Sequence, residues 1–363
     1  MRIRLTAFAR YDRLAASTRQ RLLQYIPALN EAGIDVDYRP LLGDDYVASL
    51  GGESRFPISK LGRAYWRRIR EVAFEPLGDV VWVYAELFPR LPGLFERLMI
   101  RRGCPIVYDC DDAFFHAYDQ HRSMIFRGLF RHKLEPLMRA AAVCTCGNAY
   151  LRDYAARYCP NSVILPTVVD TDLFRPMALP GKGPPVIGWI GSPSSWNYLQ
   201  PILPILEPLV REGLAKVRIV GAGGKAASQG PSWIEFADWS EENEIRELQQ
   251  MNIGIMPLPD EPWARGKSGY KLIQYMACGL PVVASPVGVN RVIVDECKSG
   301  FLAGTSAEWD ISLRRLLSDC DLRHRMGVAG RDRAVGTYSL AVHAPRFVEI
   351  IRSQAKKSGA AGR

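Results

Sequence analysis

Short runs of apolar residues alternate along the chain with longer segments in which apolar residues recur every three or four positions. The runs have the length and composition of buried strands, and the longer segments have the period of amphipathic helices. Strands that alternate with helices predict a parallel sheet with helices on both faces. In the first half, the pattern predicts helices at residues 18–32 and 91–102 and strands at residues 2–9, 34–38, 79–84, 105–109, 141–146 and 162–165.

The pattern stops in the middle of the chain and then starts again. Residues 172–185 are rich in Pro and Gly and have no periodicity, which is typical of a linker. After them we predict strands at residues 186–190, 216–220, 234–236, 253–256 and 282–284, and helices at residues 199–211, 241–251, 318–335 and 340–355.

With 363 residues, the chain is long enough for two domains. The predicted fold is α/β, with two doubly wound Rossmann-like domains at residues 1–175 and 186–338 and a linker at 176–185. Ligands of open parallel sheets bind at the carboxyl ends of the strands, so we expect a site in a cleft between the two domains.

The most informative segment is residues 266–290. Gly266-Lys-Ser-Gly269 opens a predicted helix, and Gly279 ends it just before an apolar strand. Glycines at a loop-to-helix junction let backbone amides approach an anion, and the helix N-terminus adds partial positive charge. Lys267 and Lys271 flank this junction. We therefore predict that Lys267, Ser268, Gly269 and Lys271 hold a diphosphate.

The next residues, Met276-Ala-Cys-Gly-Leu-Pro-Val-Val-Ala-Ser285, carry a resemblance to a known family. They resemble, without a gap, the donor-site signature of retaining glycosyltransferases of the GT-B fold, family 4, also described as glycosyl transferases group 1. Residues 295–302 resemble the return strand of that family, and residues 169–176 resemble the end of its first domain. The resemblance is strong over residues 180–335 and weak in the first half.

The resemblance implies a GT-B fold with a donor-binding second domain and an acceptor-side first domain. It also implies that a C-terminal helix, residues 339–355, crosses back to the first domain. We expect the remaining tail, residues 356–363, to be disordered.

The resemblance also implies donor contacts from two strand-end loops of the second domain. Gly191 and Ser192 begin a loop where the family carries an Arg and, five residues on, a Lys. This chain has neither, so we expect Lys267, Lys271 and Arg265 to supply the charge; a plain serine-capped turn is the alternative. Gly221 should let the nucleotide lie against the sheet.

Family 4 normally has two glutamates near the donor sugar and ribose, and here their positions are Gly266 and Gln274. We expect Gln274 to hydrogen-bond a ribose hydroxyl and Asp260 or Glu261 to reach the sugar.

Three carboxylates follow one predicted strand of the first half. Asp109 and Asp111 have the spacing of the metal-binding carboxylates of GT-A transferases, which leaves a metal-dependent enzyme as an alternative. With a metal-independent GT-B enzyme, Asp111 and Asp112 are instead the candidate catalytic residues that position or deprotonate an acceptor hydroxyl. A structural Asp cap is an equal alternative, and His116 is a second candidate. We assign no metal site.

Two arginines near the N-terminus are further candidates. Arg19 and Arg21 stand in the predicted helix that follows the first strand. They could contact a phosphate or the acceptor, or they could be solvated.

The formal net charge is +9, which indicates an anionic partner. No nucleic-acid-binding motif is present, so we expect no nucleic acid and favour a phosphate-rich substrate and an anionic membrane surface. Residues 59–70 and 125–133 are basic and carry aromatics, which suits a membrane surface, although ordinary amphipathic helices have the same pattern. With no signal peptide or long apolar run, we expect a cytoplasmic protein, peripheral at the membrane if bound there.

Together these features predict a retaining glycosyltransferase without a cofactor. It would move a sugar from a nucleotide-diphosphate-sugar to a hydroxyl of a glycan or lipid-linked acceptor, in glycan, polysaccharide or glycolipid biosynthesis. Because the paired glutamates are missing, a GT-B nucleotide-sugar epimerase and a non-catalytic nucleotide-sugar-binding protein remain alternatives.

Overall fold

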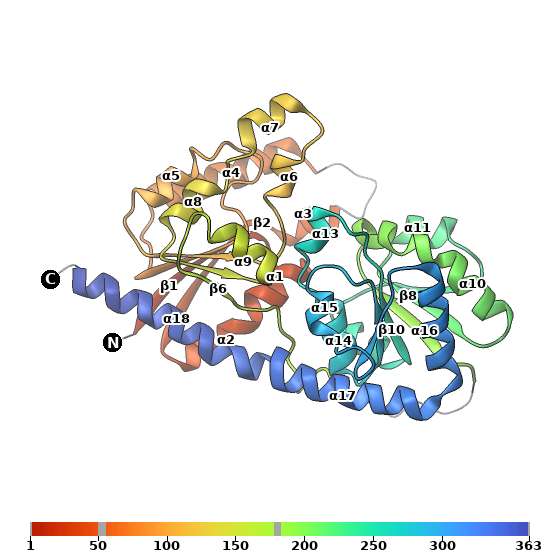
Figure 1. Ribbon diagram of the computed structural model, residues 1–363. Coiled ribbons are helices and arrows are strands. Elements are labelled where there is room, and N and C mark those ends of the chain that lie inside the picture. The colour runs from red at the N-terminus through yellow and green to blue at the C-terminus, as the bar shows by residue number, and fades with distance from the viewer. Residues whose placement is uncertain (1, 50–55, 178–182, 362–363) are drawn as a thin grey trace. The chain divides into compact units, whose positions relative to one another are not determined.

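The computed structural model describes residues 2–49, 56–177 and 183–361 (Figure 1). The chain forms two compact units. Unit 1 comprises Met1–Thr167, Gly266–Ser268 and Leu340–Arg363, and unit 2 comprises Val168–Arg265 and Gly269–Ser339.

Unit 1 is built on a six-stranded parallel sheet with the strand order β2-β1-β3-β4-β5-β6. Its strands are β1 (Ile3–Tyr11), β2 (Ile34–Leu42), β3 (Val80–Tyr84), β4 (Ile106–Cys110), β5 (Val143–Cys146) and β6 (Ser162–Ile164). Its helices are α1 (Ala16–Arg21), η1 (Leu23–Tyr25), α2 (Ile26–Glu31), α3 (Asp44–Ser49), α4 (Ile58–Ala73), α5 (Glu96–Ile100), α6 (His116–Asp119), α7 (Met124–Phe130), α8 (Glu135–Ala140), α9 (Ala149–Ala155) and α18 (Leu340–Ala361).

Unit 2 also has a six-stranded parallel sheet, with the order β12-β11-β10-β7-β8-β9. Its strands are β7 (Val186–Ile190), β8 (Lys216–Val220), β9 (Ile234–Ala237), β10 (Ile253–Met256), β11 (Val282–Ala284) and β12 (Gly300–Leu302). Its helices are η2 (Pro193–Tyr198), η3 (Gln200–Ile202), α10 (Leu203–Arg211), α11 (Gly224–Gln229), α12 (Glu244–Gln249), α13 (Pro262–Arg265), α14 (Tyr270–Ala277), α15 (Asn290–Ile293), α16 (Ser306–Ser318) and α17 (Cys320–Tyr338).

Each sheet has one point where the strand order reverses. In unit 1 the chain runs outward from β1 to β2, and then from β3 toward β6 on the other side. In unit 2 it runs from β7 to β9, and then from β10 to β12 on the other side. In open α/β sheets, ligands bind outside the carboxyl ends of the two strands that flank such a switch point. The fold therefore marks the ends of β1 and β3, and those of β7 and β10.

Aromatic packing fixes the C-terminal helix α18 to the sheet of unit 1. The ring of Phe347 is fully buried, with its centroid 4.5 Å from that of Trp82 and 5.2 Å from that of Tyr25. Arg352 donates to the carbonyl oxygen of Ala32 at 2.8 Å, at the end of α2. Such edge-on and tilted aromatic pairs add to the stabilisation that burial gives.

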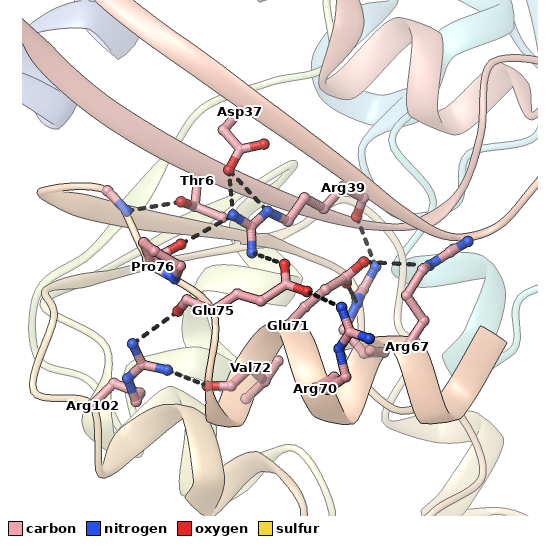
Figure 2. Close-up of polar contacts among 12 residues, drawn as sticks. Thr6, Asp37, Arg39, Arg67, Arg70, Glu71, Val72, Glu75, Pro76 and Arg102 are labelled. Atoms are coloured by element: carbon pink, nitrogen blue, oxygen red, sulfur yellow. Dashed lines mark hydrogen bonds and ion pairs between the residues drawn. The ribbon is translucent and has the colours of Figure 1, made fainter. Parts of the chain in front are cut away.

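A network of arginines ties α4 to the second strand and to the turn before β3 (Figure 2). The guanidinium of Arg39 binds Asp37 at 2.8 Å and the carbonyl oxygen of Pro76 at 3.0 Å, and it lies 3.4 Å from Glu75. Arg102 donates to the carbonyl oxygens of Val72 and Glu75, so it holds the C-terminal end of α4. These contacts fasten α4 to β2 and to the turn before β3.

The strands found in the structure confirm the strand predictions. Four strands, Val186–Ile190, Lys216–Val220, Ile253–Met256 and Val282–Ala284, have the bounds that the apolar runs predict. The helix predicted over residues 18–32 is instead divided into α1, η1 and α2. Pro27 stands in the first turn of α2 and lacks the N–H that a continuous helix would need there.

The predicted domain limits differ from the limits of the units. The chain passes from unit 1 to unit 2 between Thr167 and Val168, before the predicted linker at residues 176–185, and residues 178–182 of that linker lie outside the described residues. Val169 and Phe174 are buried in the core of unit 2, so the boundary lies nearer the N-terminus than predicted. At the other end, α18 continues to Ala361, into the tail that we expected to be disordered, because Ala and Lys are strong helix formers.

A fully buried ion pair connects four segments of unit 1. Arg21 in α1 donates to both carboxylate oxygens of Asp109 at distances from 2.7 to 3.1 Å, and to the carbonyl oxygen of Leu165 at 2.6 Å. Thr145 in β5 donates to the same carboxylate at 2.6 Å. Every charge of the pair is thus hydrogen-bonded, as a buried ion pair requires.

We predict that Arg21→Met lowers the free energy of unfolding by about 3–5 kcal/mol, because it leaves the Asp109 carboxylate buried without its cation. Urea unfolding at neutral pH measures this loss. The double variant Arg21→Met/Asp109→Asn is the control and should regain part of the stability. A loss below about 1 kcal/mol in the single variant would contradict the structural role given to this pair.

Candidate functional site

Two glycines bring the ends of β7 and β8 together in unit 2. A Cβ on Gly191 would lie 2.2 Å from the Trp189 ring, and a Cβ on Gly221 would lie 2.4 Å from the carbonyl oxygen of Gly191. Gly221 also has a φ of 78°, which favours glycine. The loops after β7 and β8 therefore meet backbone to backbone, and Gly191 stands at the switch point of this sheet.

Lys271 reaches the same loop from the first turn of α14. Its ammonium lies 4.7 Å from the centre of the Trp189 ring and 3.5 Å from the hydroxyl oxygen of Ser195. Ser195 also donates to the carbonyl oxygen of Ser192 and accepts from its amide, each at 3.0 Å. The structure thus brings together three predicted site residues, Gly191, Ser192 and Lys271, and Trp189 fixes the cation by a cation–π contact.

The start of α14 depends on Gly269. This residue caps the helix with a φ of 69°, and a Cβ there would lie 2.3 Å from the Cδ1 of Ile293. The first-turn amides of a helix have no partners within the helix and carry partial positive charge. The eight-residue helix α14 therefore presents amide donors beside Lys271 at this edge of unit 2.

The residues just before Gly269 belong to unit 1. The side-chain amide of Asn148 donates to the carbonyl oxygens of Gly266 and Lys267, both at 3.0 Å, while its oxygen caps α9 by accepting from Leu151. A Cβ on Gly266 would lie 2.5 Å from that of Ala113. Residues Gly266–Ser268 are therefore held against the ends of β4 and β5.

This placement gives Lys267 a carboxylate neighbour. Its Nζ lies 3.9 Å from the Oδ2 of Asp112, and both side chains are part-exposed. The predicted cation and one of the predicted catalytic carboxylates thus form an ion pair within unit 1. Predicted residue Ser268 lies in the same segment.

Asp111 is the buried member of the carboxylate group. It is 6% exposed and accepts a hydrogen bond from the hydroxyl of Tyr84 at 3.0 Å. Burial, and then the negative charge of Asp112, raise the pKa of Asp111 to about 7. A carboxyl group with such a pKa exchanges a proton near neutral pH, as a general acid or base does.

Asp109 and the two arginines serve the structure. The Asp109 carboxylate is fully used by Arg21 and Thr145. Arg21 is fully buried by this pair, and Arg19 donates to the carbonyl oxygens of Arg13 and Leu14 in its own loop. The expectation that Arg19 and Arg21 meet a phosphate or an acceptor does not fit this geometry, so we correct it. Arg21 is buried against Asp109, and Arg19 holds the loop before α1, so both side chains support the fold.

Of the three residues predicted to contact the sugar or the ribose, Asp260 and Glu261 are exposed and Gln274 is buried. Asp260 is exposed and pairs with Arg265 at 2.7 Å, so Arg265 is already partly neutralised. Glu261 is exposed and accepts from the hydroxyl of Tyr198 at 3.3 Å. Gln274 is 2% exposed, and its amide donates to the buried Glu244 at 2.9 Å. A ribose contact by Gln274 would have to share or replace this bond.

Among the described residues, no group of three or more His, Cys, Asp or Glu side chains is placed to hold a metal ion. His116 binds Asp119 and Tyr150 through its two ring nitrogens, each at 2.8 Å.

Sequence reasoning missed Trp189, Asn148, Tyr84 and Glu244. The first three end a strand or follow one closely, and that position at the carboxyl edge is the signal that could have found them. Glu244 pairs with a residue 30 positions away and has no such local signal.

The two doubly wound units, each with a parallel six-stranded sheet, define the fold class of GT-B glycosyltransferases. Residues 184–319 match the family model for glycosyl transferases group 1. The resemblance predicted from the sequence is confirmed for this part of the chain, and the predicted fold class is confirmed for both units. The alternative of a GT-A enzyme is wrong, because the fold is GT-B and because Arg21 and Thr145 already occupy Asp109.

Solved structures of low sequence identity share this fold. Sucrose-phosphate synthase from Thermosynechococcus elongatus has a TM-score of 0.72 at 16% identity, covering 97% of this chain and 99% of that one. HepE of Anabaena in complex with UDP and glucose has a TM-score of 0.69 at 12% identity, covering 97% and 100%. WaaG, a glycosyltransferase involved in lipopolysaccharide biosynthesis, has a TM-score of 0.65 at 13% identity, covering 96% and 99%. No curated protein matches the chain in sequence.

The raised pKa of Asp111 predicts a particular pH dependence of stability. Its ordinary value is about 3.9, so between about pH 4 and pH 7 the folded protein holds a proton here that the unfolded chain has lost. Stability contributed by this proton falls as the pH rises through that window and is gone above it. The side chain of Asp111→Asn cannot titrate. The free energy of unfolding of this variant, relative to that of the wild type, should therefore rise by on the order of 2 kcal/mol from about pH 5 to about pH 8.

Urea unfolding at these two pH values measures the gain. Asp112→Asn is the control. It removes the neighbouring negative charge, so the pKa of Asp111 should fall and the loss of stability should occur at lower pH than in the wild type. An equal difference between wild type and Asp111→Asn at both pH values would show that Asp111 is ionised throughout.

Proposed function

We propose that this protein is a retaining glycosyltransferase that moves a sugar from a nucleotide-diphosphate-sugar to an acceptor hydroxyl. The observation that carries the proposal is the site of unit 2. There Lys271 and the start of α14 meet the glycine loop after β7 at the switch point of the sheet. Amide donors, a lysine and closely approaching backbone are the usual elements of a phosphate site.

Similar structures support a diphosphate donor. HepE has been solved in complex with UDP, with UDP and glucose, and with UDP-glucose. We extend this donor class to the present chain, with UDP as the first nucleotide to test. The sugar and the acceptor are proposed only as a hexose and a glycan or lipid-linked hydroxyl compound.

In the proposed mechanism, unit 2 stabilises the leaving group. Negative charge grows on the diphosphate as the glycosidic bond breaks, and fixed positive groups lower the barrier when they face that charge. Lys271 and the amides of α14 are placed for this role. Lys267 is two residues from Gly269, so its Cα lies within about 8 Å of that residue, and we assign it to the same diphosphate.

Unit 1 is proposed to position the acceptor. Asp111 and Asp112 lie at the end of β4; the pKa of Asp111 is about 7, and Asp112 lies beside Lys267. Two neighbouring carboxyl groups of this kind can accept a proton from a hydroxyl and orient it. Asp112 is the part-exposed member, so it is the one that an acceptor would touch.

We also propose that unit 1 binds an anionic membrane surface from the cytoplasmic side. Helix α7 exposes Met124, Ile125 and Leu129 between basic residues such as Arg122 and Arg131. On α4, Trp66 is 64% exposed among Lys60, Arg63 and Arg70. Apolar side chains flanked by cations suit the boundary of an anionic bilayer. No helix among the described residues has the length and apolar character to cross a bilayer.

The donor site predicts a selective loss of nucleotide binding. We expect UDP to raise the melting temperature of the wild type more than GDP, ADP or dTDP does. Lys271→Ala and Lys267→Ala should each weaken UDP binding by on the order of 2–4 kcal/mol, since each removes a charge partner of the diphosphate. Titration calorimetry gives the dissociation constants.

Lys298→Ala is the matched control. Lys298 is exposed, pairs only weakly with Asp295, and precedes β12 at the amino edge of the sheet. Unchanged binding in both site variants would remove the diphosphate from this site. Incubation of the preferred donor separates the classes of enzyme, because an epimerase converts the donor alone and a transferase needs an acceptor. Activity in excess chelator would exclude a required divalent ion.

The membrane proposal predicts that Ile125→Ser/Leu129→Ser reduces binding to phosphatidylglycerol vesicles by about tenfold, since two exposed apolar side chains are lost. Sedimentation with sucrose-loaded vesicles measures it. Val328→Ser in α17, also exposed, is the control and should bind as the wild type does. Equal binding of all three proteins, or equal binding to phosphatidylcholine, would sink this part of the proposal.

A further inference from the structure

The switch point of unit 1 carries charged and aromatic residues that the proposed mechanism does not use. Arg10 and Tyr11 end β1, and the segment from Ala85 to Arg90 follows β3. These are the two strands between which the order of the sheet reverses. Ligands of open α/β sheets bind at this place, outside the carboxyl ends.

The segment after β3 is held in an unusual conformation. Ala85 and Arg90 have φ values of 62° and 58°, in the left-handed region that residues other than glycine rarely adopt. Tyr65 donates to the carbonyl oxygen of Pro89 at 2.7 Å, and the amide of Arg90 donates to the hydroxyl of Tyr118 at 3.1 Å. Backbone strain that the surroundings enforce in this way is concentrated at functional sites.

A buried glutamate orients Arg10. Glu86 is 2% exposed, accepts from the Nη1 of Arg10 at 3.1 Å, and accepts from the hydroxyl of Tyr118 at 2.5 Å. The Arg10 side chain, 24% exposed, stacks on the Tyr11 ring at 4.8 Å. Among the described residues, the Nε of Arg10 is buried and has no hydrogen-bond partner. A buried donor of this kind is costly unless something else accepts from it.

Arg90 adds a second cation beside the first. Its side chain is exposed, and within the described part of the chain its guanidinium forms no hydrogen bond or ion pair. Burial raises the pKa of both Tyr11 and Tyr65, and the charges of Arg10 and Arg90 oppose that rise at both hydroxyls. Arg10 stacks on the Tyr11 ring, and Tyr65 binds the residue before Arg90, so both cations belong to the same part of the sheet edge. Glu86 pairs with Arg10 and also lies 4.0 Å from the ammonium of Lys133, so it is shared between two cations.

We propose that Arg10 and Arg90 bind a phosphate or carboxylate group of the acceptor. The group must be an anion that only accepts hydrogen bonds, because the groups without partners here are donors. Tyr11 and Tyr65 flank it and can pack on a sugar ring. The proposal rests on the proposed function in that it names the acceptor as anionic. The site itself lies wholly in unit 1 and is independent of nucleotide binding.

The test uses the full chain with saturating UDP, so that the proposed donor site is occupied. The probes are inorganic phosphate, glucuronate and a short-chain phosphatidic acid below its micellar concentration, each titrated against chloride of equal ionic strength. Arg90→Ala should bind the preferred probe about tenfold more weakly, because one charge-assisted contact is lost. Arg101→Ala, which removes an exposed arginine before β4 at the amino edge, should bind as the wild type does.

Arg10→Lys provides a second variant that keeps the cation for Glu86 but loses the planar pair of donors. It should also weaken binding, without loss of the melting transition. The probe that binds most tightly tells a lipid phosphate from a free phosphate or a uronic acid, and tightest binding of any one of them supports the proposal. Equal binding by wild type, Arg90→Ala and Arg101→Ala, or no binding of any probe, would overturn it. Probe binding that depends on Arg90 in a protein that none of UDP, GDP, ADP and dTDP stabilises would refute the proposed function and leave this site standing.

Discussion

The buried ion pair of Arg21 and Asp109 is the constraint on which the organisation of unit 1 depends. A charged pair with no access to water is tolerated only when hydrogen bonds satisfy both groups. Arg21 meets this condition with Asp109 and the carbonyl oxygen of Leu165, and Thr145 completes Asp109. One side chain thereby connects α1, the end of β4, β5 and the residue after β6. Any shift of these segments would break a charged contact in the interior.

That same pair determines the chemistry of the carboxylates next to it. Asp109, Asp111 and Asp112 lie within four residues, and Arg21 forms its ion pair with the first of them. Asp111 is buried without a cation of its own and holds its proton to about neutral pH. Asp112 is less buried and has Lys267 nearby. The three carboxyl groups of one sequence motif thus differ: Asp109 is paired in the interior, Asp111 has a pKa near neutral, and Asp112 is the part-exposed partner of Lys267.

The sequence was sufficient to predict what depends on local patterns. Apolar runs gave the strands, and Gly191, Gly221 and Gly269 were found because each stands where a strand or helix end requires a bare backbone. The role of Arg21 could not be predicted from the sequence, because its partner Asp109 is 88 residues away. For the same reason the sequence could not tell which carboxylate of the Asp109–Asp112 group is already paired. Asn148, which binds a segment 118 residues on, has no local signal for that contact.

The two switch points use different means of recognition. In unit 2 the strand ends meet through glycines, and their donors are backbone amides with one lysine, which suits a diphosphate that is the same in every nucleotide-diphosphate-sugar. In unit 1 the strand ends carry Arg10, Tyr11, Glu86 and Arg90, whose side chains define the shape and charge of whatever binds. A backbone site keeps its ligand when side chains change, whereas a side-chain site changes its ligand with them. Under the proposed function, donor chemistry is thus built into the fold of unit 2, and acceptor specificity is set by a few side chains at the ends of β1 and β3.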